Sequence, residues 1–74
     1  MTAAEARARA WHAKANQYNS LAMIHVAAMT TPAIYNEDRR QMAMDRHSEA
    51  AESYGAESQL WSALADQLEK DGKP

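Results

Sequence analysis

The chain has no cysteine and no phenylalanine, and it has only two glycines and two prolines among 74 residues. The lack of cysteine excludes disulfides and thiolate metal sites, and it leaves the redox compartment open. A chain of this length allows one domain. Seventeen of its hydrophobic residues are alanine and only seven are large aliphatic residues. Since a core this small supplies roughly 3–5 kcal/mol at best, we expect the chain to associate with itself.

Long hydrophobic runs are also lacking. The longest apolar stretch, residues 21–29, is interrupted by His25 and is far too short to span a membrane. Residues 1–10 alternate charge with alanine, a pattern without the apolar core of a signal peptide. A cytoplasmic protein is therefore expected. Small, alanine-rich proteins without motifs are common on phages and other mobile elements, so we favour such a source.

Motifs that carry chemistry are missing as well. The sequence contains no glycine-rich phosphate loop, no spaced set of metal ligands and no pairing of a nucleophile with a base. A thin helical hairpin also lacks the concave pocket that a substrate requires. We therefore expect no enzymatic activity, no cofactor, no metal and no small-molecule substrate.

The most informative feature that is present is a mirror pattern of rings. Trp11, Tyr18 and His25 recur at seven-residue spacing, and the same residue types return in reverse order in the second half. The matching residues are His47, Tyr54 and Trp61, and the numbers of each pair sum to 72. Two helices folded antiparallel about this centre would stack like against like.

Helix signals support two long helices. Thr2 and Glu5 form a capping-box pattern at the start of the first helix, and the residue before Pro32 is pushed out of helical geometry. Asn36 is placed to cap a second helix, which Gly72 would end. The prediction is a single helical hairpin over 1–74, with a helix over about 3–29, a loop or short turn over 30–36 and a helix over about 37–70.

Apolar residues at alternating three- and four-residue spacing predict the stripes that join the helices, as in a coiled coil. The predicted stripe of the first helix is Ala4, Ala8, Trp11, Ala15, Tyr18, Ala22, His25 and Met29. The predicted stripe of the second helix is Met44, His47, Ala51, Tyr54, Ser58, Trp61, Ala65 and Leu68.

Two alternatives concern how these stripes meet. A register with pair sums near 65 also fits, but it would expose Leu64 and Leu68, so we favour the sum of 72. Gly55 is tolerated at an exposed position of the second helix, or allows a close approach of the helices beside Tyr54, or breaks the second helix, which would give three helices with Ser58 as a cap. We favour the unbroken helix because no second turn-forming residue stands beside the glycine.

The charges of the two halves are opposite. Residues 1–36 carry a net charge of +2 and residues 37–74 carry −4, counted with neutral histidine. In an antiparallel hairpin the basic start lies beside the acidic end, which contains Asp66 and Glu69. We therefore expect ion pairs within the chain, and the charge pattern does not require a nucleic-acid partner.

His25 and His47 would lie in contact in the favoured register. Two adjacent imidazoles resist double protonation, so they form a candidate pH-sensitive pair. Zinc needs three or four ligands and spacing fixes no third one. The simplest interpretation is a polar layer that sets the register of the helices.

The loop end is the candidate interaction site. Residues 21–29 are apolar all the way round, so one partner helix cannot bury them. The predicted protein-interface residues are Met23, Val26, Met29, Ile34, Tyr35, Arg39 and Met42. The alternative is that the loop over 30–36 alone covers these residues. We favour binding of a second copy, giving a homodimeric four-helix bundle, or of another protein, as a small regulatory, inhibitor or assembly factor.

The alternative function is binding of RNA or DNA. Arg39, Arg40 and Arg46 would supply contacts to phosphates. Acidic residues interleave with these arginines and the chain is acidic overall, so nucleic acid is the less favoured partner. Membrane binding is disfavoured for the same reason.

Overall fold

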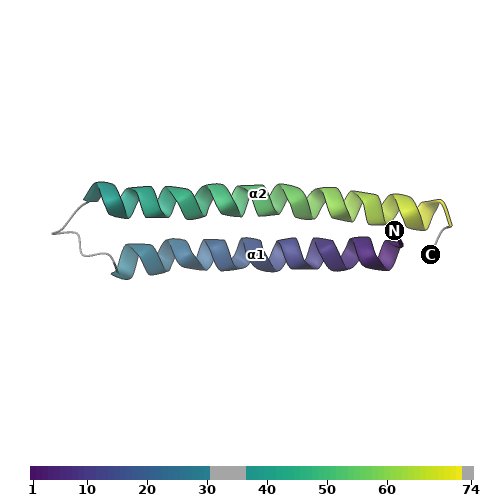
Figure 1. Ribbon diagram of the computed structural model, residues 1–74, viewed down its shortest axis with the longest axis horizontal. Helices are drawn as coiled ribbons and strands as arrows, with labels where there is room; N and C mark the ends of the chain where they lie inside the picture. The colour runs from purple at the N-terminus through teal and green to yellow at the C-terminus, as the bar shows by residue number, and fades with distance from the viewer. Residues whose placement is uncertain (31–36, 73–74) are drawn as a thin grey trace.

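The computed structural model describes residues 1–30 and 37–72, which form two helices, α1 (Ala3–Thr30) and α2 (Glu37–Lys70). The helices run side by side in opposite directions, so the start of α1 and the end of α2 lie at the same end of the hairpin (Figure 1). The Cα trace extends over 58 × 14 × 12 Å. The predicted all-α antiparallel hairpin is confirmed. The predicted turn within 30–36 and the cap at Asn36 lie outside the described residues.

The start of α1 has the predicted capping box. The backbone N–H of Glu5 donates to Oγ1 of Thr2 at 3.1 Å, and the backbone N–H of Thr2 donates to Oε1 of Glu5 at 3.2 Å. These two bonds satisfy backbone donors that the first turn leaves without helical partners. The bond from the Thr2 backbone lowers the pKa of the Glu5 carboxyl, because it favours the charged form.

Helix α2 continues through Gly55 without interruption, so a break at this residue is wrong. A Cβ atom added to Gly55 would lie 2.5 Å from Nε2 of Gln17 on α1. The glycine therefore permits a close approach of the helices. The helix ends where Gly72 adopts a positive φ of 70° and its N–H donates to the carbonyl of Glu69 at 3.0 Å.

The most buried residues of the interface between the helices are all alanine or serine. Along α1 the residues that face α2 follow heptad spacing, and we call them the inner stripe of α1. They are Ala3, Ala6, Ala10, Ala13, Gln17, Ser20, Ile24 and Ala27, all buried or half-buried. Among the described residues no large side chain is fully buried. Small residues let two backbones approach closely, so the core is a thin line of alanine and serine contacts.

Helix α2 meets this line with the predicted stripe. Every one of its eight residues is buried or half-buried, and Ala51, Ser58 and Ala65 are the most buried. Small residues at every seventh position therefore alternate with larger ones, which flank the line of contact.

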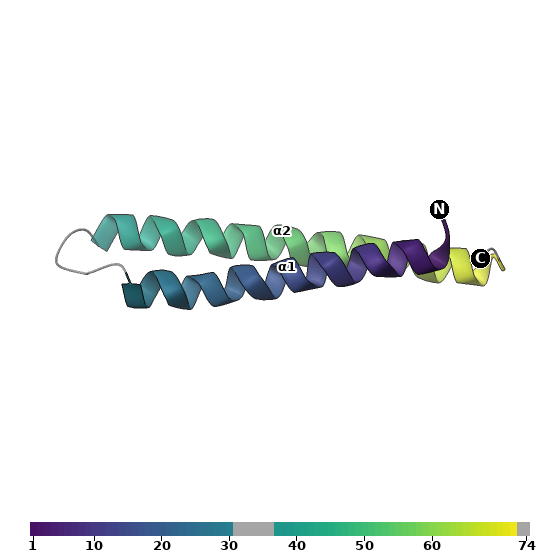
Figure 2. The same ribbon diagram turned by 60° about the horizontal axis from the view of Figure 1, so that its bottom comes forward.

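Contacts across the hairpin define its register. Gln17 lies against Gly55, and the hydroxyl of Ser58 donates to the carbonyl of Ala10 at 3.1 Å. The residue numbers of these pairs sum to 72 and 68. Two further contacts between the helices, of Arg7 with Asp66 and of Arg9 with Trp61, have sums of 73 and 70. Three of the four sums lie within two of 72 and none lies within two of 65, so the register near 72 describes the hairpin better than the alternative. Figure 2 shows the two helices from a second side, with the last turn of α2 beyond the start of α1.

Candidate protein-interaction face

Helix α1 carries a second apolar stripe, which is exposed to solvent. We call it the outer stripe of α1. Its residues are Ala4, Ala8, Trp11, Ala15, Tyr18, Ala22, His25 and Met29, and all eight are exposed. Trp11 is 74% exposed, Tyr18 61% and Met29 83%. At 100° per residue the centre of this stripe lies roughly 150° around the helix from the centre of the inner stripe.

The outer stripe is the set of residues predicted to face α2, and that prediction is wrong for α1. The expected stacking of Trp11 on Trp61 and of Tyr18 on Tyr54 fails with it, because Trp11 and Tyr18 point to solvent. The physical reason is the width of a ring. An indole between the helices would hold them apart, whereas alanine at the inner positions allows their backbones to approach.

The two histidines lie in different surroundings for the same reason. His47 is half-buried within the α2 stripe, whereas His25 is exposed on the outer stripe of α1. The predicted contact between their imidazoles is not supported by this arrangement. The candidate pH-sensitive pair therefore loses its structural basis.

One aromatic ring on each helix has a cationic side chain close to its face. The guanidinium of Arg9 lies 5.0 Å from the ring centre of Trp61, and it covers an indole that α1 leaves half-buried. The ammonium of Lys14 lies 5.7 Å from the ring centre of Tyr18, one helical turn along the outer stripe. Such contacts are attractive because a ring face carries negative charge density.

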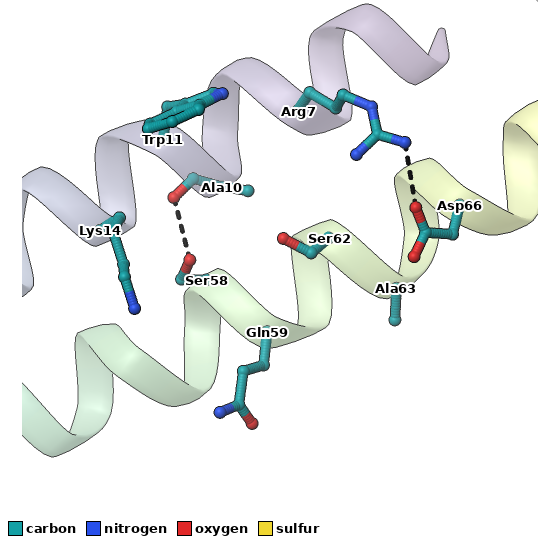
Figure 3. A pocket seen from close by; sticks show the side chains of 9 residues that line it. All are labelled: Arg7, Ala10, Trp11, Lys14, Ser58, Gln59, Ser62, Ala63 and Asp66. Carbon is teal, nitrogen blue, oxygen red and sulfur yellow. Dashed lines mark hydrogen bonds and ion pairs between the residues drawn. The ribbon is translucent and has the colours of Figure 1, made fainter.

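A groove of about 530 Å³ opens beside the outer stripe, between α1 and α2. Figure 3 shows Trp11 and Lys14 on its α1 side and small side chains of α2 opposite them. The lining residues are Arg7, Ala10, Trp11, Lys14, Ser58, Gln59, Ser62, Ala63 and Asp66. Sequence reasoning missed this groove, because it assigned Trp11 to the helix–helix contact.

Arg7 closes one end of the groove. Its guanidinium lies 3.0 Å from Oδ1 of Asp66 and 2.7 Å from Oε2 of Glu69. The hydrogen bonds to Glu69 and then Asp66 raise the pKa of Arg7, and the bond from Arg7 lowers the pKa of Glu69. The expected pairing of the basic start with the acidic end of the chain is confirmed at this position.

The predicted interface at the loop end is exposed where it is described. Met23 and Val26 are each 42% exposed, and Met42 is 61% exposed. Met29 belongs to the same end and also to the outer stripe. Ile34 and Tyr35 lie outside the described residues. The role of these residues in an interface stays a prediction.

The arginines of the second helix do not share one face. Arg40 occupies the position one heptad before His47, and its Nη2 donates to Oε1 of Glu37 at 2.6 Å. Its Nη1 donates to the carbonyl of Ala28 at 3.3 Å, near the end of α1, where carbonyls lack helical partners. Arg39 and Arg46 are exposed and stand seven residues apart on the outer side of α2.

In the part of the chain that the structure describes, no three residues among His, Asp and Glu come together as metal ligands would. Neither α1 nor α2 combines the length and apolar character that a membrane crossing requires. Comparisons of the chain with protein families, with curated proteins and with solved structures find no match.

Proposed function

We propose that this protein is a small protein-interaction module, acting as a regulatory or assembly factor, and that it binds its partner along the outer stripe of α1. The observation that carries the proposal is a full-length apolar stripe that the fold does not use. The residues at every third or fourth position from Ala4 to Met29 are apolar or histidine, and all are exposed. A continuous exposed stripe of this kind is typical of an interface.

The composition of the stripe suits a helical partner. Large residues (Trp11, Tyr18 and Met29) alternate with alanines, which leave shallow hollows between the rings. This alternation allows the side chains of a second helix to interdigitate with the stripe. Aromatic residues are frequent hot spots of binding, and burying one such side chain contributes roughly 1.5–3 kcal/mol.

Nucleic-acid binding has less support. It would need several arginines on one positively charged face. Arg40 is instead bound to Glu37 and to a backbone carbonyl of α1, and it stands in line with the residues that face α1. The surface around Arg39 and Arg46 also contains Asp38, Asp45 and Glu49.

The test compares three tagged baits in lysate of the source organism: the wild type, Ala22→Glu on the outer stripe, and Ala56→Glu on the exposed side of α2. Both alanines are exposed in helices, so the two substitutions have similar effects on the hairpin itself. We expect a protein, either the untagged chain or a different one, to be retained by the wild type and by Ala56→Glu. It should be lost with Ala22→Glu. Equal retention by all three baits would contradict the proposal.

A further inference from the structure

Resting on the proposed function, we infer that the occupant of the outer stripe of α1 is the same stripe of a second copy, packed antiparallel about a two-fold axis. In this pairing residue i lies opposite the partner position 33 − i. The centre of the pairing is therefore between residues 16 and 17, close to the middle of α1 (Ala3–Thr30).

The large and small side chains of the outer stripe are complementary to those of a second, antiparallel copy. In this register each large residue of one copy meets an alanine position of the other. Trp11 meets position 22, Tyr18 meets 15, His25 meets 8 and Met29 meets 4, and all four positions are alanine. Shifting the register by one heptad either leaves the last turn of the stripe without a partner or sets Trp11 against Met29. A two-fold interface must be self-complementary in this way.

The distribution of charge along α1 favours the antiparallel orientation of the two copies. All charged residues of α1 lie in its first half, where Arg7, Arg9 and Lys14 outnumber Glu5, and residues 15–30 contain no Asp, Glu, Lys or Arg. An antiparallel pairing sets the cations of each copy beside the uncharged half of the other. A parallel pairing would set the cations of the two copies side by side, and like charges at such spacing repel. Antiparallel helix dipoles favour the same arrangement.

The surface area of the hairpin also favours a second copy as the partner. The chain exposes 5538 Å², whereas a compact protein of 8.2 kDa is expected to expose about 4,500 Å². The difference is close to the roughly 800 Å² that each partner buries in a standard interface. The hairpin thus carries about one interface more surface than its mass requires, and the outer stripe, with Trp11, Tyr18 and Met29 exposed, supplies an apolar part of it.

The measurement is the mass of the full chain in solution by analytical ultracentrifugation over a range of concentrations. We expect a mass twice the 8.2 kDa of one chain at micromolar concentration and above. Ala15→Glu and Ala22→Glu should weaken association at least roughly tenfold, because each buries a charge against a ring of the partner. Ala56→Glu should leave it unchanged. Circular dichroism on the same samples checks that each variant remains helical.

Fluorescence supplies a second measurement that needs no charged variant. In the Trp61→Phe chain, Trp11 is the only indole. Its emission should shift to shorter wavelength as the chain is concentrated, because the partner removes the indole from water. An emission maximum that does not change with concentration would overturn the inference.

Cysteine cross-linking tests the orientation, since the chain has no cysteine of its own. We expect Ala8→Cys mixed with His25→Cys to form a disulfide between copies, and Ala8→Cys alone to form little. Efficient cross-linking of Ala8→Cys with itself would overturn the antiparallel pairing. A wild-type chain that stays monomeric overturns the second copy as occupant. The proposed function fails separately, when the Ala22→Glu bait retains the same proteins as the wild type.

Discussion

The two stripes of α1 differ in a way that reverses a common expectation. The inner stripe contains polar Gln17 and Ser20 among alanines and is buried or half-buried, whereas the outer stripe contains Trp11 and Tyr18 and is exposed. Hydrophobicity alone would bury the stripe with the rings. The structure buries the stripe that allows the closer approach of α2.

The size of its side chains can therefore decide which face of a helix meets its neighbour. The α2 stripe already brings Tyr54, Trp61 and Leu68 to the edges of the contact, where all three are half-buried. These side chains need small residues opposite them, because two wide stripes facing each other would leave gaps between the backbones. The wide side chains of α1 are then left for a second partner.

The largest loss of stability is expected from placing a larger side chain on the inner stripe. Ala6 is fully buried, so Ala6→Leu forces a larger side chain into the contact with α2. Overpacking of this kind typically lowers the free energy of unfolding by about 1–3 kcal/mol. Urea denaturation followed by circular dichroism, on dilute protein, measures the loss.

The matched control is Ala8→Leu, the same change two residues further along α1. Ala8 is exposed on the outer stripe, so the hairpin has room for leucine there. We expect the free energy of unfolding of this variant to stay within about 0.5 kcal/mol of the wild type. A greater loss for Ala8→Leu than for Ala6→Leu would reverse the assignment of the two stripes.

The next largest change in stability is expected at Gly55, where the two helices come close. Alanine is better than glycine within a helix by about 1 kcal/mol, but its Cβ would lie 2.5 Å from Nε2 and 3.2 Å from Cδ of Gln17. The Oε1 atom of Gln17 is buried and has no hydrogen-bond partner among the described residues. We expect Gly55→Ala to change stability little by itself, because the gain in helix propensity is offset by the displacement of Gln17.

In a Gln17→Ala background the same Gly55→Ala change should stabilise the hairpin by about 1 kcal/mol. The difference between the two backgrounds is the coupling energy, which a double-mutant cycle in urea measures. Identical effects in both backgrounds would mean that Gln17 does not oppose a side chain at position 55, and that the glycine does not mark a close approach.

Much of the fold could be predicted from local signals. The capping box at Thr2, the long runs without helix breakers and the heptad spacing of α2 each act within a few residues, so the sequence displays them directly. The register followed from pairing the two halves by number, and Gly55 indicated where the helices come close. The face that α1 turns to α2 could not be predicted in this way, because α1 has two stripes at heptad spacing.

The choice between those stripes depends on the distance between the helix axes, which is a property of the pair. One signal was available in the sequence. Ala3, Ala6, Ala10 and Ala13 form an unbroken run of small residues at interface spacing, a pattern that indicates close packing. The groove beside Trp11 follows from this choice of face, so it was missed with it. The pairing of Arg7 with the acidic end of the chain was predicted, because it depends on charge and on the antiparallel direction of the helices.

A smaller effect is expected at Ser58, the buried hydroxyl of the interface. It is 8% exposed, and its Oγ donates to the carbonyl of Ala10 across the two helices. Ser58→Ala should lower the free energy of unfolding by about 0.5–1.5 kcal/mol, the usual net contribution of one hydrogen bond. Ser53→Ala, at an exposed position of the same helix, should cost less than half as much in the same urea titration. Equal losses would argue against a specific bond across the interface.

The smallest effect is expected at Arg7, which lies on the flank between the two stripes and is bound to Asp66 and Glu69. The contact is exposed, so Arg7→Gln should lower the midpoint of thermal unfolding only slightly at neutral pH, and not at all in molar salt, where charges are screened. The pKa of Glu69 is lowered from its usual 4.5. A carboxyl with a lowered pKa stabilises the fold above the unfolded value, and this contribution disappears as the pH falls below 4.5 through the folded value.

The difference between wild type and Arg7→Gln should therefore be present at pH 7 and vanish in acid. Glu5 also has a lowered pKa, through its bond with Thr2, and Arg7→Gln does not change either partner of that bond. Subtracting the two midpoints of thermal unfolding at each pH removes the contribution of Glu5 and leaves the contribution of the Arg7 contact. A difference that stays unchanged however far the pH falls below 4.5 would show that Arg7 stabilises the hairpin through the packing of its alkyl chain rather than through its charge.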